Sequence, residues 1–170
     1  AEKSESYEIC FIPDNDYRGF LKRRVNGLEE KVKGGKFISL KGEVLGTHDG
    51  YPFYTVGQRK IGVSLGSQPT YVVGIDPEKN TVTVGTKEDL RKQEMMIRDI
   101  NYVKLPQIKD GTECLVKVRY KHKGEMATIT NIGNNLKVLF HHQVHGIAPG
   151  QSAVLYIEND LIAGGFIMKN

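Results

Sequence analysis

The stretch CLVKVRYK, residues 114–121, alternates apolar and cationic side chains from Val116 onward. The apolar or aromatic positions are Val116, Val118 and Tyr120, and the cationic positions are Lys117, Arg119 and Lys121. Because successive side chains of a β-strand point to opposite faces, this period of two predicts a strand with one face in the core and one cationic face. Cys114 shares the apolar face, so we interpret it as a core residue.

The second half of the chain predicts six strands. With residues 114–121, they are residues 96–103, 126–132, 136–142, 153–157 and 161–168. Their spacing is close and even, and polar connectors such as Asn134-Asn135 separate them. This regularity favours a small closed antiparallel barrel, because closure removes exposed strand edges.

The first half of the chain combines short helices and hairpins. A polar side chain at residues 14–16 can cap a helix whose apolar face contains Tyr17, Phe20 and Leu21. The other predicted elements are hairpins at residues 37–45 and 70–85, a short strand at 53–56 and a short helix at 86–92.

The predicted fold is therefore mainly β, with a small central domain that is α+β or barrel-like and then a six-stranded antiparallel β-barrel. We expect residues 1–30 to form a segment with Cys10 and the first helix. Residues 31–92 would form the central domain, and residues 93–170 the barrel.

Composition gives broad limits on function. The chain has 170 residues, a net charge of +4 and a pI near 9.0, a mild bias toward polyanions. Two cysteines are too few for a secreted disulfide framework, so we expect a reducing, cytoplasmic compartment. The sequence contains neither an apolar signal core nor a run of roughly 18 apolar residues, so no membrane partner is expected. The start is polar and lacks Met, as though cut from a longer protein.

Cys10 and the histidines are the candidates for chemistry. Cys10 lies in the apolar stretch 8–12, just before a predicted turn, and local pattern alone favours an inert core cysteine over a reactive one. His141, His142 and His145 invite a metal-binding interpretation, but no cysteine or carboxylate cluster of recognisable spacing accompanies them. We predict no metal site.

The cationic face of residues 114–121 has two interpretations. Charged outward residues protect β proteins from aggregation, which makes a solvated face the simple explanation. Charges of one sign along a strand also repel each other unless an anion meets them, which favours contact with nucleic acid. The pattern alone leaves both open.

Five blocks of sequence carry a resemblance to a known family. They are residues 6–12 (SYEICFI), 42–50 (GEVLGTHDG), 54–60 (YTVGQRK), 117–120 (KVRY) and 149–154 (PGQSAV). In this order they resemble the tRNA-specific 2-thiouridylase family along essentially the whole chain.

The resemblance implies a cytoplasmic enzyme that uses ATP to adenylate the C2 oxygen of the wobble uridine of certain tRNAs, and then replaces this oxygen with sulfur. A sulfur-donor relay protein would supply the sulfur, and Cys10 would carry it as a persulfide. A second cysteine would release it by forming a disulfide, which is ordinary thiol exchange.

The family's ATP-binding domain and its first catalytic cysteine precede the block that contains Cys10, and nothing like them occurs in this sequence. The resemblance therefore implies the C-terminal part of such an enzyme, inactive alone, with ATP and magnesium bound by the missing N-terminal domain. It also implies an elongation-factor-like barrel with tRNA contacts at Arg119, Tyr120 and Gln151. Lys117 and Lys121 join them as members of the cationic face.

Two other functions fit parts of the sequence. A non-enzymatic RNA-binding β-barrel module with a structural cysteine would need only the cationic strand. A cysteine hydrolase that uses Cys10 with a histidine would need a spatial pairing that the sequence does not reveal.

Overall fold

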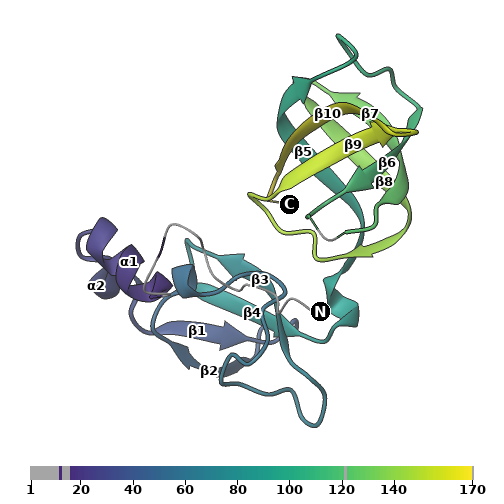
Figure 1. Cartoon of the computed structure of the whole chain (residues 1–170). Helices are drawn as coiled ribbons and strands as arrows, with labels where there is room; N and C mark the ends of the chain where they lie inside the picture. Colours follow the sequence, from purple (N-terminus) through teal and green to yellow (C-terminus); the bar gives the residue numbers. More distant parts are fainter. Residues whose placement is uncertain (1–11, 13–15, 121, 170) are drawn as a thin grey trace, which may run out of the picture.

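The structure is a computed structural model that describes residues 12, 16–120 and 122–169. Two β-rich units form the arms of a bent molecule (Figure 1). We call residues 16–90 the sheet arm and residues 91–169 the barrel arm. Cys10 and Lys121 lie outside the described residues.

The barrel arm is a closed six-stranded barrel. Its strands are β5 (Arg91–Tyr102), β6 (Thr112–Lys117), β7 (Glu125–Ile132), β8 (Asn135–His145), β9 (Ser152–Ile157) and β10 (Asp160–Ile167). They pair in the order β10-β5-β8-β7-β6-β9, and every neighbouring pair is antiparallel. The predicted mainly β fold with an antiparallel barrel is confirmed. Three boundaries were wrong by three residues or more, because the first strand begins at Arg91, the second ends at Lys117 and the fourth ends at His145.

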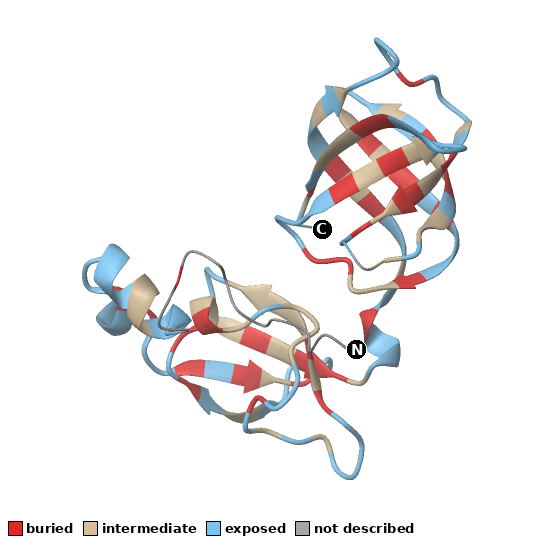
Figure 2. Ribbon diagram, viewed as in Figure 1, coloured by how far each residue is buried: buried red, intermediate tan, exposed pale blue. Residues whose placement is uncertain are grey.

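The barrel interior is filled by the inward positions of every strand. Phe140, Met95 and Ile97 are among its largest buried side chains. Figure 2 shows the buried residues as bands that alternate with more exposed ones along the strands. Cys114 belongs to this core and is 1% exposed. Burial, with a smaller effect of the Glu113 carboxylate, raises the pKa of its thiol to about 12. The interpretation of Cys114 as a core residue is confirmed.

The sheet arm contains a smaller mixed sheet. Its strands are β1 (Gly35–Ile38), β2 (Val44–His48), β3 (Tyr71–Asp76) and β4 (Thr81–Gly85), in the order β2-β1-β4-β3. Both predicted hairpins are present, and β1 and β4 pair in parallel between them. Gly42, with φ +85°, turns the first hairpin. The core of the sheet forms around Phe37, Val72 and Val82.

Two short helices lie beside the sheet. In α1 (Tyr17–Arg24) the side chain of Asp16 accepts a hydrogen bond from the Gly19 N–H at 2.8 Å, so the predicted cap is confirmed at this residue. Helix α2 (Leu28–Val32) packs Leu28 and Val32 against Phe53. Among the described residues, no helix is long and apolar enough to cross a membrane.

Two predicted elements of the sheet arm differ from the structure. Residues 53–56 do not form a strand, because Phe53 ends the 3₁₀ turn η1 (Tyr51–Phe53) and a second turn follows, in which the Gln58 N–H donates to the Thr55 carbonyl at 3.0 Å. The predicted helix at residues 86–92 is a single 3₁₀ turn, η2 (Glu88–Leu90). Asp89 accepts hydrogen bonds from the N–H and hydroxyl of Thr86 as a cap would, but Arg91 pairs with His145 and begins the barrel instead.

His48 is a buried ionisable residue in this arm. It is 5% exposed, and its ring contacts those of Phe37 and Tyr54 at centroid distances of 5.0 and 5.3 Å. Its Nδ1 accepts a hydrogen bond from the Gly50 N–H at 3.1 Å, which fixes the neutral form. Burial lowers the pKa of His48, and the neighbouring Asp49 carboxylate offsets this only in part.

We therefore expect the sheet arm to lose stability in mild acid. The unfolded chain takes up a proton on His48 near its ordinary pKa of about 6.5, whereas the folded chain resists it, so the free energy of unfolding falls below this pH. In His48→Gln, which retains an acceptor but does not titrate, this free energy depends less on pH between about 7 and 5. Urea unfolding at several pH values measures it, and an unchanged pH dependence would contradict the assignment.

Candidate nucleic-acid interface

A groove of about 590 Å³ opens on the barrel surface where β6 ends. We call it the barrel groove. It is lined by Lys117, Val118, Arg119, Tyr120, Gly150, Gln151, Ser152, Val154 and Tyr156. The structure thus brings together the predicted contact residues Lys117, Arg119, Tyr120 and Gln151, although 31 sequence positions separate Tyr120 from Gln151.

The end of β6 decides where Tyr120 points. Val118 is still buried, but the chain then turns, and the N–H of His122 donates to the Arg119 carbonyl at 3.0 Å. Continued alternation would have placed Tyr120 on the apolar side of the strand. Because the strand ends at Lys117, the Tyr120 side chain is instead 97% exposed. An exposed ring at the rim of a basic groove is a stacking surface for an unpaired base.

Strand β9 contributes an aromatic residue that the sequence did not reveal. Lys117 pairs with Val154, and Leu115 pairs with Tyr156. The Lys117 ammonium lies 5.2 Å from the centre of the Tyr156 ring, a cation–π contact that holds the lysine over the groove. No local pattern indicates that β6 and β9 are neighbours, so this contact could not be predicted.

Arg119 lies against a glycine on the connection from β8 to β9. A Cβ built on Gly146 would lie 3.0 Å from Nη1 of Arg119, closer than side chains normally approach. Gly146 also has φ +78°, a backbone conformation that favours glycine. This glycine therefore gives the guanidinium space beside the groove.

Gln151 is held by its backbone. Its N–H donates to the Ala148 carbonyl at 3.2 Å, and its carbonyl accepts from the Ile167 N–H at 2.8 Å. These bonds fix the turn before β9 and leave the side chain exposed. The amide is thus available to donate and accept hydrogen bonds at the groove rim.

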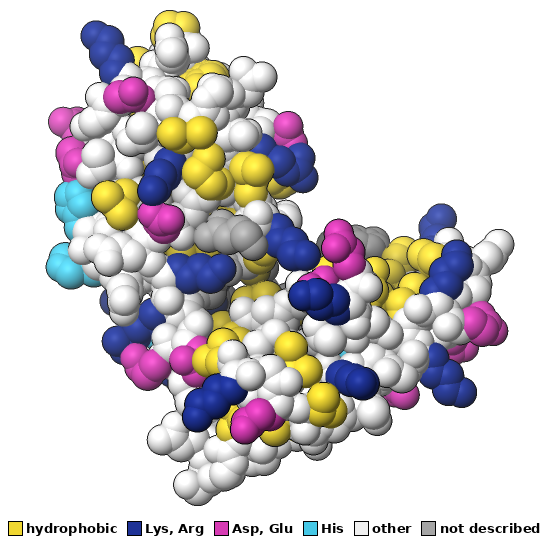
Figure 3. All heavy atoms as spheres, turned by 180° about the vertical axis from the view of Figure 1, so that it is seen from behind, with side chains coloured by type: hydrophobic (Ala, Val, Ile, Leu, Met, Phe, Trp, Pro, Cys, Tyr) yellow, Lys and Arg dark blue, Asp and Glu magenta, His cyan; other side chains and the backbone are white. Residues whose placement is uncertain are grey.

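The positive charge of the groove is not neutralised from within. No described carboxylate lies within 4.0 Å of the charged nitrogens of Lys117 or Arg119, whereas Lys137 pairs with Glu94 at 2.8 Å. Burial, followed by the charge of Arg119, lowers the pKa of the adjacent His122, so this residue adds no positive charge near neutral pH. Figure 3 shows further Lys and Arg side chains on both arms around the bend. These cations suit an anionic ligand.

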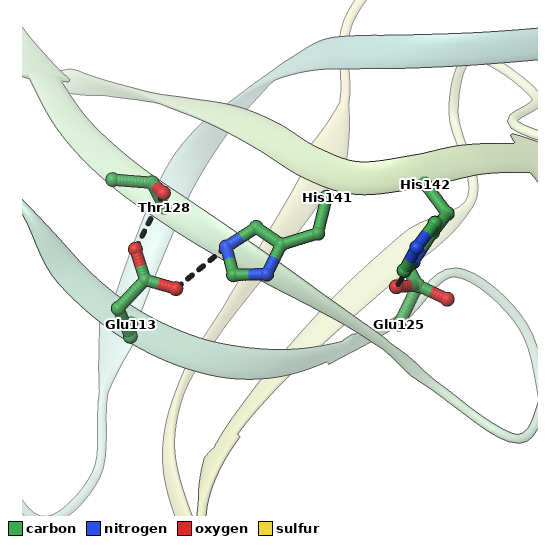
Figure 4. Close-up of polar contacts among 5 residues, drawn as sticks. All are labelled: Glu113, Glu125, Thr128, His141 and His142. Carbon is green, nitrogen blue, oxygen red and sulfur yellow. Dashed lines mark hydrogen bonds and ion pairs between the residues drawn. The ribbon is translucent and has the colours of Figure 1, made fainter.

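The histidines of β8 form separate pairs with carboxylates (Figure 4). Nε2 of His141 lies 2.6 Å from Glu113, which also accepts a hydrogen bond from Thr128 at 2.5 Å, and Nδ1 of His142 lies 2.9 Å from Glu125. The third histidine, His145, contacts Arg91. In the described part of the chain, no three His, Cys, Asp or Glu residues are grouped so that they could hold a metal ion.

Sequence comparisons relate both arms to known domains. Residues 18–86 match the tRNA methyl transferase PRC-barrel domain, and residues 92–167 match the aminomethyltransferase β-barrel domain. A tRNA-specific 2-thiouridylase MnmA of Amoebophilus asiaticus is 53% identical over 97% of this chain and 44% of its own length. Its counterparts from Cytophaga hutchinsonii and Salinibacter ruber are 51% and 48% identical over 100% and 98% of this chain, and over 46% and 44% of their own lengths. The chain spans about half the length of the curated relatives it matches, and it belongs to the tRNA-specific 2-thiouridylase family.

Proposed function

We propose that this chain holds tRNA and carries sulfur in a tRNA-uridine 2-sulfurtransferase, which makes 2-thiouridine at the wobble position. The observation that carries the proposal is the convergence of Lys117, Arg119, Tyr120 and Gln151 on one groove in a chain whose relatives are named for this reaction.

The barrel groove supplies the kinds of contact that single-stranded RNA uses. Lys117 and Arg119 neutralise phosphates, with Lys121 as a further candidate outside the described residues. Tyr120 offers its ring to a base, and Gln151 offers an amide to a base edge or a 2′-hydroxyl. Phosphate contacts position the strand, and contacts to a base add selectivity.

Cys10 is the proposed sulfur carrier. The terminal sulfur of its persulfide attacks C2 of the adenylated uridine, and AMP leaves with the original oxygen. The thiolate of a second cysteine then attacks the Cys10 sulfur, so the sulfur–sulfur bond breaks, the thione remains on C2, and a disulfide joins the two cysteines. A reductant must restore both thiols before the next cycle.

Cys114 does not suit the role of the second cysteine. It is 1% exposed and its pKa is raised to about 12, so it supplies almost no thiolate at neutral pH. We assign the second cysteine to an ATP-binding domain, which would also bind ATP and magnesium. The relatives are about twice as long as the matched region, which leaves room for such a domain. On this proposal the chain alone is inactive, and its partners in the cytoplasm are tRNA and a sulfur-donor relay protein.

Alkylation of the folded chain tests the sulfur-carrying role. With iodoacetamide at neutral pH, we expect Cys10 to react rapidly and Cys114 only after unfolding, because only an accessible thiolate reacts. Peptide mass spectrometry measures the two rates separately. If Cys10 reacts as slowly as Cys114, the result contradicts the sulfur-carrying role and favours the alternative of an RNA-binding module with a structural cysteine.

A further inference from the structure

A second groove, of about 450 Å³, lies between the two arms. We call it the inter-arm groove. The sheet arm contributes Tyr51, Tyr54 and Ile75, and the barrel arm contributes Lys92, Pro149 and Lys169. Its volume lies within the range of sites that hold small molecules, roughly 300–1,000 Å³.

The walls of this groove combine aromatic and cationic groups. Tyr54 is braced by an edge contact with Phe37 at a centroid distance of 5.2 Å, so its position is fixed by the core of the sheet. No described carboxylate lies within 4.0 Å of the ammonium groups of Lys92 or Lys169, which flank the apolar walls. A ligand with a flat, weakly polar part and a negative charge satisfies both features, and a nucleotide has this chemistry.

The inter-arm groove is continuous along the chain with the barrel groove. Pro149 lines the former, and the next residues, Gly150 and Gln151, line the latter. The turn that carries all three is tied to β10, because the Gly150 N–H donates to the Ile167 carbonyl at 2.8 Å. Neighbouring residues of a single turn therefore line both grooves.

We propose that the inter-arm groove binds an unstacked nucleotide of the same RNA strand that the barrel groove holds. Tyr51 and Tyr54 contact the base, and Lys92 and Lys169 contact its phosphates. The proposal rests on the proposed function, because it requires RNA in the barrel groove. It extends the RNA contact from the barrel arm to the sheet arm, so that bound RNA fixes the angle between them.

The test is the salt dependence of binding to unfractionated tRNA by the 170-residue chain, measured by fluorescence anisotropy. Lys92→Gln with Lys169→Gln should make the negative slope of log affinity against log salt shallower by about 1.4, because each single-strand phosphate contact contributes about −0.7. Lys87→Gln with Lys109→Gln removes the same charge from exposed sites outside both grooves and should leave the slope unchanged. Lys169→Gln alone, at an exposed residue, should give half the change.

A second readout locates the base. Ultraviolet irradiation of a 4-thiouridine-substituted oligonucleotide bound to the chain should give cross-links in the peptide that contains residues 51–56, and the double Lys92/Lys169 variant should lose them. Slopes equal to the control, together with no cross-link at residues 51–56, would overturn the proposal and assign the groove to another ligand, such as a peptide. If replacing Lys117 and Arg119 still weakens the binding of tRNA in that case, the proposed function is retained. If it does not, the proposed function is contradicted as well.

Discussion

Replacing Lys117 and Arg119 together with Gln is expected to weaken the binding of tRNA to the chain by roughly 10- to 100-fold at about 0.1 M salt. Both cations line the barrel groove without a described acidic partner, so each is available to a phosphate. The loss should be similar for tRNAs of different sequence, because phosphate contacts carry little sequence information. Equilibrium titration by fluorescence anisotropy measures the effect.

The matched control is Lys104→Gln with Lys137→Gln. These lysines change the net charge equally, but they already pair with Asp160 and Glu94. The control should weaken binding less than about threefold, since exposed, paired charges contribute little to a distant site. Equal losses in both double variants would show that binding follows net charge and not the barrel groove.

Replacing Cys10 with Ser is expected to abolish 2-thiouridine formation in the full-length enzyme proposed above, which would join this chain to an ATP-binding domain. A serine hydroxyl cannot carry a persulfide, so no sulfur reaches the activated uridine. The affinity for tRNA should stay within about twofold of the parent, because serine is close to cysteine in size and the substitution changes no charge. Single-turnover assays with mass spectrometry of the digested tRNA measure the product.

Cys114→Ala is the control for this experiment. Cys114 is buried in the barrel core, so its replacement should reduce stability by about 1 kcal/mol or more but leave the rate of product formation nearly unchanged. A normal rate in Cys10→Ser would disprove the assignment. Loss of activity in both variants would instead point to a role for the Cys114 thiol.

Local sequence patterns predicted the barrel strands because alternation is a property of single strands. Val116 and Val118 are buried as the period of two requires, and all six strands are present. The residues at which strands end are harder to predict from the sequence. Tyr120 continues the alternation in sequence, but the chain turns at Arg119 and exposes its ring. The strand predicted at residues 53–56 is likewise absent, because Phe53 ends a 3₁₀ turn and the next turn begins at Thr55.

Neighbour relations between distant segments were not predictable from the sequence. Tyr156 enters the barrel groove because β9 pairs with β6, and Gly146 accommodates Arg119 because the connection from β8 passes beside it. Both depend on barrel closure. The prediction that Gln151 contacts tRNA came only from the family resemblance, since an isolated glutamine before a strand has no distinctive pattern. The proposed sulfur-carrying role of Cys10 likewise depends on that resemblance, because local pattern favoured a buried cysteine.

Ultraviolet cross-linking of unmodified tRNA to the chain, with the attached nucleotides located by peptide mass spectrometry, tests the tRNA-binding role of the barrel groove most directly. We expect cross-links at Tyr120, with further ones in the segments around Lys117 and Gln151 that line the same groove. Cross-links confined to surfaces outside this groove, such as the face that carries His141 and His142, would contradict it.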